Sequence, residues 1–300
     1  MLRYSDEVRE AIDSGKALVA LESTIIVHGM PWPRNVEVAQ RLEEAVRASG
    51  AVPATIAIME GQPVIGLEAS ELEKLADGKA HKISTREIAW AIASKATAAT
   101  TVASTMSLAA MAGIHVFATG GIGGVHRGGG YDESADLTEL SRTRVLVVSA
   151  GAKAILDLSA TLERLETLSV PVIGYRTGDF PSFYSTTSGL PVSVRLDEVI
   201  DIARVAELHW KIPGSGGLLV ANPVPQDVAI QFEEVEKWIS EAMTKAQFIR
   251  GKALTPFLLK CINESTKGRS QSVNEALALN NASLAGSIAV AMKANVDRAL

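Results

Sequence analysis

Short apolar runs alternate along this chain with stretches that have the spacing of amphipathic helices. The predicted strands are Ala17–Leu21, Ala54–Ile58, Gln62–Ile65, Thr100–Val102, Ile114–Ala118, Val145–Ser149, Val172–Tyr175 and Gly217–Val220. The predicted helices are Asn35–Ser49, Ser84–Ser94, Met106–Ala112, Leu137–Ser141, Ser159–Leu168, Leu196–Leu208 and Asp227–Glu241, with a charged amphipathic helix before them and a mostly helical stretch after them. This alternation predicts an α/β fold, a three-layer α/β/α arrangement with a largely parallel, mixed central sheet.

The chain is long enough for one large domain or two smaller ones, and composition favours one. Of its 300 residues 47% are hydrophobic and 21% charged, which is typical of a globular protein with a large core. No Gly/Ser/Pro-rich linker, internal repeat or low-complexity segment divides it. We therefore predict a single domain over residues 1–300.

Charge and cysteine content narrow the possible partners and compartments. The net charge is −5 and no basic block occurs, so nucleic acid is not expected as a main partner. The lone Cys261 excludes an internal disulfide and suits a reducing compartment. The N-terminal stretch lacks the apolar core of a signal peptide, and no window reaches the roughly 18 apolar residues of a membrane span. We expect a soluble cytoplasmic protein without a membrane partner.

Lys153 stands in an apolar setting that a lysine rarely occupies. The predicted strand Val145–Ser149 precedes it, and a second apolar run follows it in VVSAGAKAILDL. An ammonium is costly to bury unless something uses it. At such a strand-to-turn junction, partial desolvation lowers the pKa of a lysine and frees its amine for imine chemistry. Alternatively, the stem packs and the ammonium reaches solvent; the residues alone leave both interpretations open.

Two further charged residues lie where ligands of α/β proteins collect, at strand ends and helix starts. Glu22, in LESTIIVHGMP, follows the strand Ala17–Leu21, so its carboxylate would project into a cleft; a helix cap or a surface acid is the alternative. Lys82, in HKISTRE, precedes a helix whose Ser84 and Glu87 form a capping box. Lys82 therefore indicates an anion site, although an isolated lysine can also be simply solvated.

A glycine-rich segment follows the predicted strand Ile114–Ala118. Thr119 precedes the pairs Gly120-Gly121 and Gly123-Gly124, and glycines let the backbone N–H groups approach a phosphate closely. The spacing fits neither the P-loop nor the dinucleotide fingerprint, so nucleoside triphosphate and NAD are not supported.

The polar residues after the glycines suggest proton transfer, phosphate binding and a metal. His126 and Arg127 supply a proton-transfer group and a phosphate clamp. Asp132 and Asp136, with Ser134 between them, offer oxygen ligands for a hard divalent cation. Ser134 or Asp136 could instead cap the helix that follows, and capping is compatible with catalysis.

These stretches belong to a series of motifs that runs in order along nearly the whole chain. The motifs are ALESTIIVHGMP, GAVPATIAI, ATTVASTMSLA, VFATGGIGGVHRG, SADLTEL, VVSAGAKAILDL, TLERLET, DFPSFYS, TSGLPV, LLVANPVP, TPFLL and GRSQSVNEALALNNASLAG. Together they resemble the pseudouridine-5′-phosphate glycosidase family, also called the indigoidine synthase A-like family. No single motif carries the resemblance.

The resemblance implies reversible cleavage of the C–C glycosidic bond of pseudouridine 5′-phosphate, which gives uracil and ribose 5-phosphate. Because C5 of uracil is a poor leaving group, a covalent electron sink helps the bond to break. If the ribose ring opens and a lysine captures C1′ as an imine, the bond can break by a retro-addition that protonates C5. Hydrolysis of the imine then returns ribose 5-phosphate.

The resemblance also assigns roles position by position. Lys153 in GAKAILD matches the nucleophile, and Glu22 matches the proton donor that assists ring opening and closing. Asp132 matches the ligand of a divalent cation, Mn²⁺ in the family. The predicted substrate-binding residues are Lys82, Val102 through its backbone, Thr119, His126 at the phosphate or in proton transfer, Ser134, Ala135, Asp136 and, at the base, Asn274. The family is typically trimeric, so a homotrimer is expected.

The segment before Asp132 departs from the family pattern. The loop RGGGY is shorter than usual, and Glu133 replaces an apolar residue, so Asp132 could be displaced and Glu133 could compete as a ligand. Two rival functions are another Schiff-base lyase acting on sugar phosphates and a non-catalytic phosphosugar-binding protein. The joint presence of Glu22, Lys82, Asp132 and Lys153 argues against the second.

Overall fold

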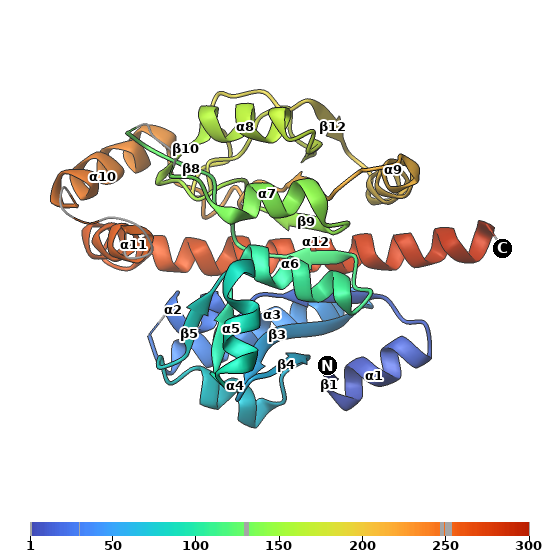
Figure 1. Ribbon diagram of the computed structural model, residues 1–300. Coiled ribbons are helices and arrows are strands. Elements are labelled where there is room, and N and C mark those ends of the chain that lie inside the picture. Colours follow the sequence, from blue (N-terminus) through green and yellow to red (C-terminus); the bar gives the residue numbers. More distant parts are fainter. Residues whose placement is uncertain (1, 30, 129–131, 247–248, 250–253, 300) are drawn as a thin grey trace.

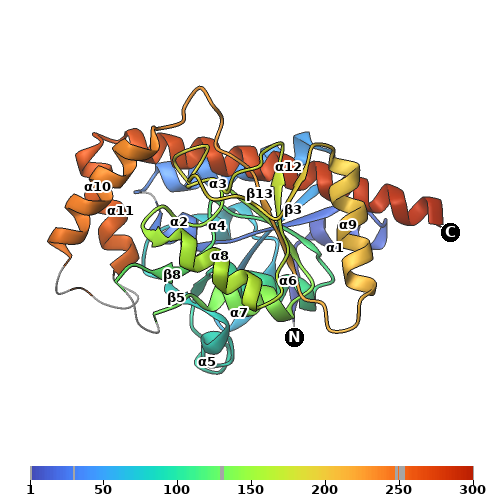
Figure 2. The ribbon, with the colours of Figure 1, turned by 90° about the horizontal axis from the view of Figure 1, so that it is seen from above.

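The computed structural model describes residues 2–29, 31–128, 132–246, 249 and 254–299. Within these ranges a central sheet is covered by helices on both faces (Figures 1 and 2). The strands are β1 (Arg3–Tyr4), β2 (Leu18–Leu21), β3 (Val52–Met59), β4 (Gln62–Ile65), β5 (His81–Ile83), β6 (Ala98–Thr100), β7 (Val116–Ala118), β8 (Val125–His126), β9 (Leu146–Ser149), β10 (Leu156–Asp157), β11 (Val172–Tyr175), β12 (Val194–Leu196) and β13 (Leu218–Ala221).

The helices alternate with the strands for most of the chain and then follow one another near its end. They are α1 (Asp6–Asp13), α2 (Thr24–His28), α3 (Arg34–Ala48), α4 (Ala69–Leu75), the 3₁₀ turn η1 (Thr85–Glu87), α5 (Ile88–Ala93), α6 (Val102–Met111), α7 (Ala135–Arg142), α8 (Leu158–Thr167), α9 (Val199–Lys211), α10 (Phe232–Lys245), α11 (Leu254–Ser265) and α12 (Arg269–Ala299). Within the described ranges, no helix combines the length and apolarity needed to cross a bilayer.

The large sheet is mixed but mostly parallel. Its order is β1-β4-β3-β2-β7-β9-β13-β11-β12, and β6 joins β3 on one side and β5 on the other. All neighbours from β3 to β12 are parallel, whereas β4 and β6 run antiparallel to β3. Strands β8 and β10 form a separate antiparallel pair. The predicted fold class is therefore confirmed.

The two helical layers are built from different parts of the chain. Helix α12 contacts α3, α9 and strands β2, β7 and β9, and in Figure 2 it lies with α3 on one side of the sheet. Helices α6, α7 and α8 lie on the other side, where α6 contacts β2 and β3. Strands covered on both faces must be apolar throughout, and every residue of β9 and β13 is buried, as expected for parallel strands.

The predicted elements correspond to observed ones, but several boundaries are displaced. Val102 begins helix α6 instead of ending a strand, because the chain leaves β6 at Thr100 and Thr101 takes the extended N-cap conformation. Leu196 ends β12 and so precedes helix α9. Residues 227–231 form the end of a turn and an irregular segment before helix α10. The short elements that carry too few residues for a clear period were not predicted: β1, β5, β8, β10, β12, α2 and α4.

A buried hydroxyl network fixes the point where strand β3 changes partner. β3 pairs with β2 through Thr55 and then with β6 from Ala57 onward. Between them the carbonyl of Ile56 accepts hydrogen bonds from Ser23 Oγ and Thr100 Oγ1, both 2.7 Å long. This network lets β2 separate from β3 while no buried polar group is left without a partner. The residue that follows β2 is thereby turned into the space at the sheet edge.

The close packing of α12 on α3 gives a stability prediction. A Cβ added to Gly286 would lie 2.6 Å from Cβ of Ser49, and overpacking of this kind costs about 1–3 kcal/mol. The gain in helix propensity is smaller, at most about 1 kcal/mol. We expect Gly286→Ala to lower the free energy of unfolding by about 1 kcal/mol in urea denaturation. Ser287→Ala, at the next position, should stay within about 0.5 kcal/mol of the parent. A more stable Gly286→Ala would contradict the packing.

Candidate active site

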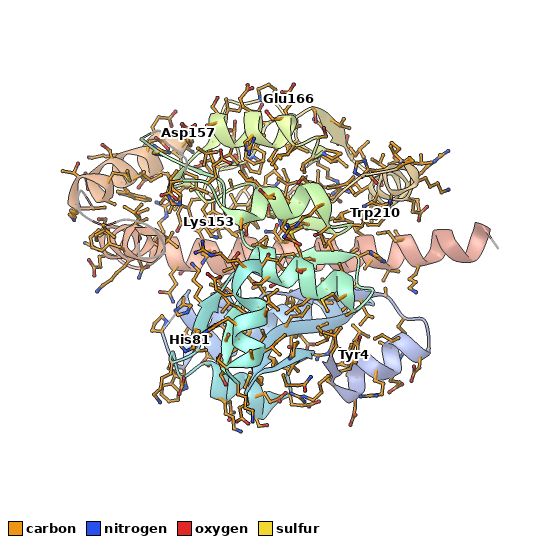
Figure 3. All side chains as sticks on the ribbon, viewed as in Figure 1. Tyr4, His81, Lys153, Asp157, Glu166 and Trp210 are labelled. Atoms are coloured by element: carbon orange, nitrogen blue, oxygen red, sulfur yellow. The ribbon has the colours of Figure 1, made fainter. Side chains whose placement is uncertain are left out.

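Polar residues gather beyond the carboxyl ends of neighbouring parallel strands. β2, β7, β9 and β13 are consecutive in the sheet. Glu22 directly follows β2, Thr119 follows β7, and the loop to Lys153 follows β9. Figure 3 shows Lys153 near the middle of the molecule, at the junction between its α7–α8 and α5–α6 parts. Open α/β sheets bind ligands at this edge, so the structure brings the two predicted catalytic residues to a suitable place.

Glu22 lies in a narrow pocket with mostly apolar walls. The pocket is lined by Leu21, Glu22, Ile25, Leu42, Ala118, Thr119, Gly120 and Ala278. Burial raises the pKa of Glu22, opposed first by the charge of Lys153 and then by a hydrogen bond from the Thr119 hydroxyl to Oε1. A carboxyl group with a raised pKa keeps its proton to higher pH, which is what a general acid requires.

The electrostatic surroundings of Glu22 define the rest of the site. Lys82 lowers its pKa slightly, and Asp136 raises it. Both residues therefore lie within range of the same carboxyl group as Lys153. Lys82 belongs to strand β5 and precedes the 3₁₀ turn η1, where both bonds of the predicted Ser84–Glu87 capping box are present. Residues far apart in the sequence thus form one charged cluster.

The loop that carries Lys153 is held by its backbone. The N–H of Lys153 donates to the carbonyl of Ile122 over 3.0 Å, and Ala152 forms a parallel bridge with Ile122. Gly151 has φ +75°, and a Cβ there would lie 2.3 Å from the carbonyl oxygen of Pro181. Only glycine fits this position, which holds the loop in one conformation. The loop thereby fixes the backbone from which the half-buried side chain of Lys153 extends.

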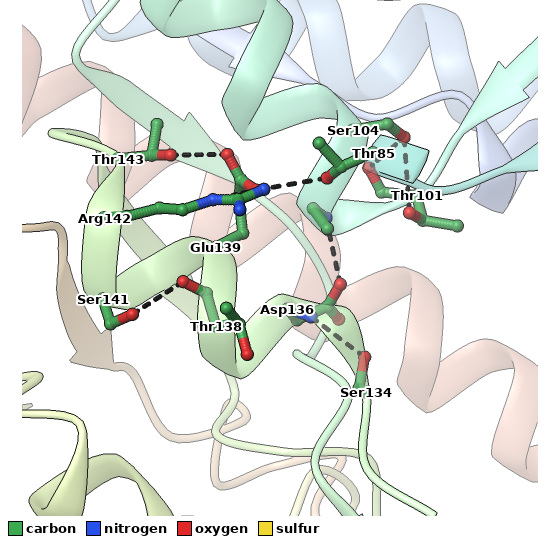
Figure 4. A network of polar contacts seen from close by, with 11 residues as sticks. Thr85, Thr101, Ser104, Ser134, Asp136, Thr138, Glu139, Ser141, Arg142 and Thr143 are labelled. Carbon is green, nitrogen blue, oxygen red and sulfur yellow. Dashed lines mark hydrogen bonds and ion pairs between the residues drawn. The ribbon is translucent and has the colours of Figure 1, made fainter. Parts of the chain in front are cut away.

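Asp136 connects the glycine-rich loop with the start of helix α6. Its Oδ1 accepts from the N–H of Ala103 over 3.0 Å, and its Oδ2 accepts from the N–H of Gly123 over 2.7 Å. Ser134 caps helix α7 by accepting from the N–H of Asp136 (Figure 4). The capping alternative is thus confirmed for Ser134, and Asp136 caps α6. Val102, buried, begins α6 beside these contacts.

A second polar network in Figure 4 joins helix α7 to the segment after Lys82. The buried carboxylate of Glu139 accepts hydrogen bonds from Thr85 over 3.2 Å and from Arg142 and Thr143. Glu139 is 3% exposed, so these partners offset its burial. The contact with Thr85 fixes η1, and with it the end of β5, against α7.

The glycines after Thr119 are required by side chains packed upon them. A Cβ on Gly120 would lie 3.3 Å from Oδ1 of Asn274, which places this predicted base contact above the loop. A Cβ on Gly121 would lie 2.6 Å from the ring of Phe183, a residue with φ +57°. Phe183 was not predicted as a site residue, because its only signal in the sequence was its place in the DFPSFYS motif.

His126 and Asp132 lie on a hairpin beside the Lys153 loop. The N–H of His126 donates to the carbonyl of Asp132 over 3.0 Å, and β8 pairs with β10, which follows Lys153. The side chain of Asp132 is exposed, while Glu133 forms an ion pair with Arg164 over 2.9 Å. The possible competition from Glu133 is therefore not supported. Gly129, Gly130 and Tyr131 of the shortened loop lie outside the described residues.

Few protein side chains in the candidate site are placed to bind the predicted divalent cation. Among the described residues, no group of three His, Cys, Asp or Glu side chains could hold a metal ion. The residues present thus do not form a complete protein ligand set. Mg²⁺-like ions are commonly bound by one or two carboxylates, with the other positions filled by water and substrate phosphate. Asp132, exposed beside the site, fits only this sparse mode.

Arg127 does not act as the expected phosphate clamp. Its guanidinium donates to Glu236 over 2.6 and 2.7 Å and to the carbonyls of Leu156 and Ala154 over 3.1 and 3.0 Å. These bonds use the fork of donors to tie β8 to the segment after Lys153 and to helix α10. Its role in this structure is to hold the loop.

Comparison with known proteins places this site in a family. The family model described as indigoidine synthase A like protein matches residues 7–291. The chain belongs to the indigoidine synthase A-like family. Within it, the chain is 53% identical to a pseudouridine-5′-phosphate glycosidase of Chloroflexus aurantiacus over 97% of this chain and 98% of that one.

Two solved structures of similar proteins share the fold. The indigoidine synthase A-like protein of Thermotoga maritima is 40% identical, with a TM-score of 0.91, over 98% of this chain and 97% of the other. The prealnumycin C-glycosynthase AlnA, solved with ribulose 5-phosphate, is also 40% identical, with a TM-score of 0.92 over 99% of both chains. A protein similar to this chain in sequence and fold has thus been solved with a pentose phosphate.

The raised pKa of Glu22 predicts a pH-dependent stability effect. The unfolded chain releases this proton near the ordinary glutamate pKa and the folded chain releases it later, so stability falls as pH rises through the folded value. Glu22→Gln has no carboxyl group that titrates at this position, so it does not lose this stability. We expect the variant to gain stability over the parent as pH rises above about 4.3, with the advantage constant above the folded pKa.

Urea denaturation between pH 4 and 9 measures this difference in the free energy of unfolding. In a separate assay, turnover by Glu22→Gln should be roughly 10²–10⁴-fold lower than that of the parent. Glu73→Gln, on an exposed position of α4, is the control and should track the parent at each pH. If instead the free energy of unfolding of the parent rises with pH relative to that of Glu22→Gln, the folded protein favours the carboxylate form of Glu22, which contradicts the prediction.

Proposed function

We propose that the protein cleaves the C–C glycosidic bond of pseudouridine 5′-phosphate reversibly to uracil and ribose 5-phosphate, through an imine on Lys153. The observation that carries this proposal is a half-buried acid in a narrow pocket and a half-buried lysine at one strand edge, with Lys153 the strongest charge acting on Glu22. Pseudouridine-5′-phosphate glycosidases about half identical to this chain over nearly its whole length support the substrate, and the pentose phosphate complex of AlnA supports the sugar.

Glu22 supplies the proton that opens the sugar ring. As the C1′–O4′ bond breaks, O4′ takes the proton of Glu22 and C1′ becomes electrophilic through conjugation with the uracil ring. The Thr119 hydroxyl bonded to Oε1 orients the carboxyl group for this transfer. Because the pocket walls are mostly apolar, water competes little for the acid.

Lys153 supplies the electron pair that breaks the C–C bond. Its neutral amine adds to C1′, and the ammonium that forms gives a proton to the Glu22 carboxylate; the nitrogen lone pair then forms the C=N bond while the C1′–C5 bond breaks and C5 takes up that proton. Uracil leaves, and water hydrolyses the imine to ribose 5-phosphate and free lysine.

The remaining predicted residues bind the substrate in this proposal. The phosphate lies near the N-terminus of α6 at Val102 and the glycine-rich loop, at backbone N–H groups other than the two bonded to Asp136, with Lys82 and His126 as side-chain partners. The start of α7, Ser134-Ala135-Asp136, borders the same space, and Asn274 above Gly120 reaches the base. We also propose a homotrimer in the cytoplasm, as the family resemblance suggests.

The proposed activity is tested by product analysis. Purified protein with pseudouridine 5′-phosphate should release equal amounts of uracil and ribose 5-phosphate, and the two products should form pseudouridine 5′-phosphate in reverse. Lys153→Arg keeps the charge but cannot form the imine, because guanidinium stays protonated, so the variant should be inactive while folded. Release of a different aglycone or a carbon–carbon cleavage within the sugar would favour another Schiff-base lyase.

A divalent cation, Mn²⁺ in our proposal, is expected at Asp132 together with water and substrate phosphate, where it would neutralise phosphate charge. Removing divalent ions with a chelator should abolish most activity, and Mn²⁺ should restore it. Asp132→Asn should need a higher Mn²⁺ concentration for half-maximal activity, whereas Glu133→Gln should not, since Glu133 is paired with Arg164. Full activity of the chelated protein would remove the cation from the mechanism.

A further inference from the structure

Asn281 is a fully buried amide in an otherwise apolar part of helix α12. The side chain is 0% exposed, and its neighbours Leu277, Ala278, Ala282 and Ala285 are buried too. A buried amide costs free energy unless its donors and acceptor are bonded. Here the Asn281 Nδ2 group donates to the carbonyl of Thr119 over 2.8 Å and to that of Gly120 over 3.3 Å.

The acceptor of the same amide is used as well. Oδ1 of Asn281 accepts from Nδ2 of Asn222 over 2.9 Å, and the N–H of Asn222 donates to the carbonyl of Ser149 over 2.8 Å. Asn222 directly follows β13, and Ser149 ends β9. The two asparagines therefore tie the carboxyl ends of β7, β9 and β13 to α12.

This pair controls a residue in the site. Thr119 is the first residue after β7, where its N–H still continues the ladder to Val148 over 3.0 Å but its carbonyl leaves the sheet. Asn281 takes that carbonyl and the next one, which fixes the peptide planes on the C-terminal side of Thr119. The side-chain hydroxyl of Thr119 in turn donates to Glu22. The chain of contacts runs from α12 to the acid without a gap.

We propose that Asn281 is a positioning residue for the reaction: it fixes the peptide of Thr119 so that the Thr119 hydroxyl holds Glu22. This inference rests on the proposed function for its kinetic part only. Asn222 supports Asn281 from the opposite side. Neither residue touches the substrate in this account.

The expected effect is on turnover more than on binding. Asn281→Leu keeps the approximate volume but removes both donors, so Thr119 can rotate away from Glu22. We expect kcat to fall roughly 10- to 100-fold, the scale on which supporting residues and small displacements act, with KM changed less than about 3-fold. Asn280→Leu is the matched control, because its amide donates to Pro223 and not to the loop, and it should keep the parent kcat.

A pH profile separates positioning from general destabilisation. The Thr119 bond lowers the pKa of Glu22, so losing it should move the alkaline limb of kcat to higher pH. Thr119→Val should move the limb in the same direction, and the Thr119→Val, Asn281→Leu double variant should be no worse than Thr119→Val alone. Thr119→Ser should retain most of the effect of the hydroxyl.

Three results would overturn the inference: the parent kcat and pH profile in Asn281→Leu, an equal loss in Asn280→Leu, or additive losses in the double variant. If Asn281→Leu does not fold, Asn281→Ser is measured in the same way and decides.

A parent protein without the proposed activity refutes the proposed function alone. Titration of ¹³C-labelled Glu22, assigned with Glu22→Gln, then tests Asn281 without substrate, and an unchanged Glu22 titration in Asn281→Leu refutes the positioning.

Discussion

Glu22 loses most of its water at the end of β2, and the charge of Lys153 and the hydroxyl of Thr119 only partly compensate for that loss. This competition requires that the acid, the lysine and the hydroxyl arrive from different strands at one place. Parallel pairing of β2, β7 and β9 achieves this, because it brings their carboxyl ends together. β2 stops pairing with β3 after Leu21, and Glu22 follows directly in the pocket that Thr119 also lines.

Most polar groups beneath the site hold the backbone and do not face the substrate. Both carboxylate oxygens of Asp136 accept hydrogen bonds from the N–H groups of Ala103 and Gly123. The guanidinium of Arg127 donates to Glu236 and two carbonyls, and the amide of Asn281 donates to the loop after β7. A site of this kind gains precision from buried polar groups whose hydrogen bonds are satisfied, since each one specifies a single local conformation.

The residues that could be predicted were those with a local signature. Apolar runs gave the positions of the longer strands, so Glu22 and Lys153 could be placed at strand ends, and the spacing of Ser84 and Glu87 gave a capping box that is present. Val102 was misplaced because a run of threonine and valine has strand propensity, while the helix start depends on Asp136. Arg127 could not be interpreted locally, since its partner Glu236 is 109 residues away. Asn281 had a weak signal, an amide within an apolar helical stretch, whose meaning depends on packing against Thr119.

The central claim is that Lys153 forms a covalent imine with the sugar beside a protonated Glu22. Borohydride added to the protein with ribose 5-phosphate tests it most directly, because reduction fixes the imine as a stable secondary amine. If the imine forms, peptide mass spectrometry should map one sugar phosphate per chain to Lys153, with Lys82 unmodified and no adduct in Lys153→Ala. An adduct on another lysine, or substantial C–C cleavage by Lys153→Ala, would contradict it.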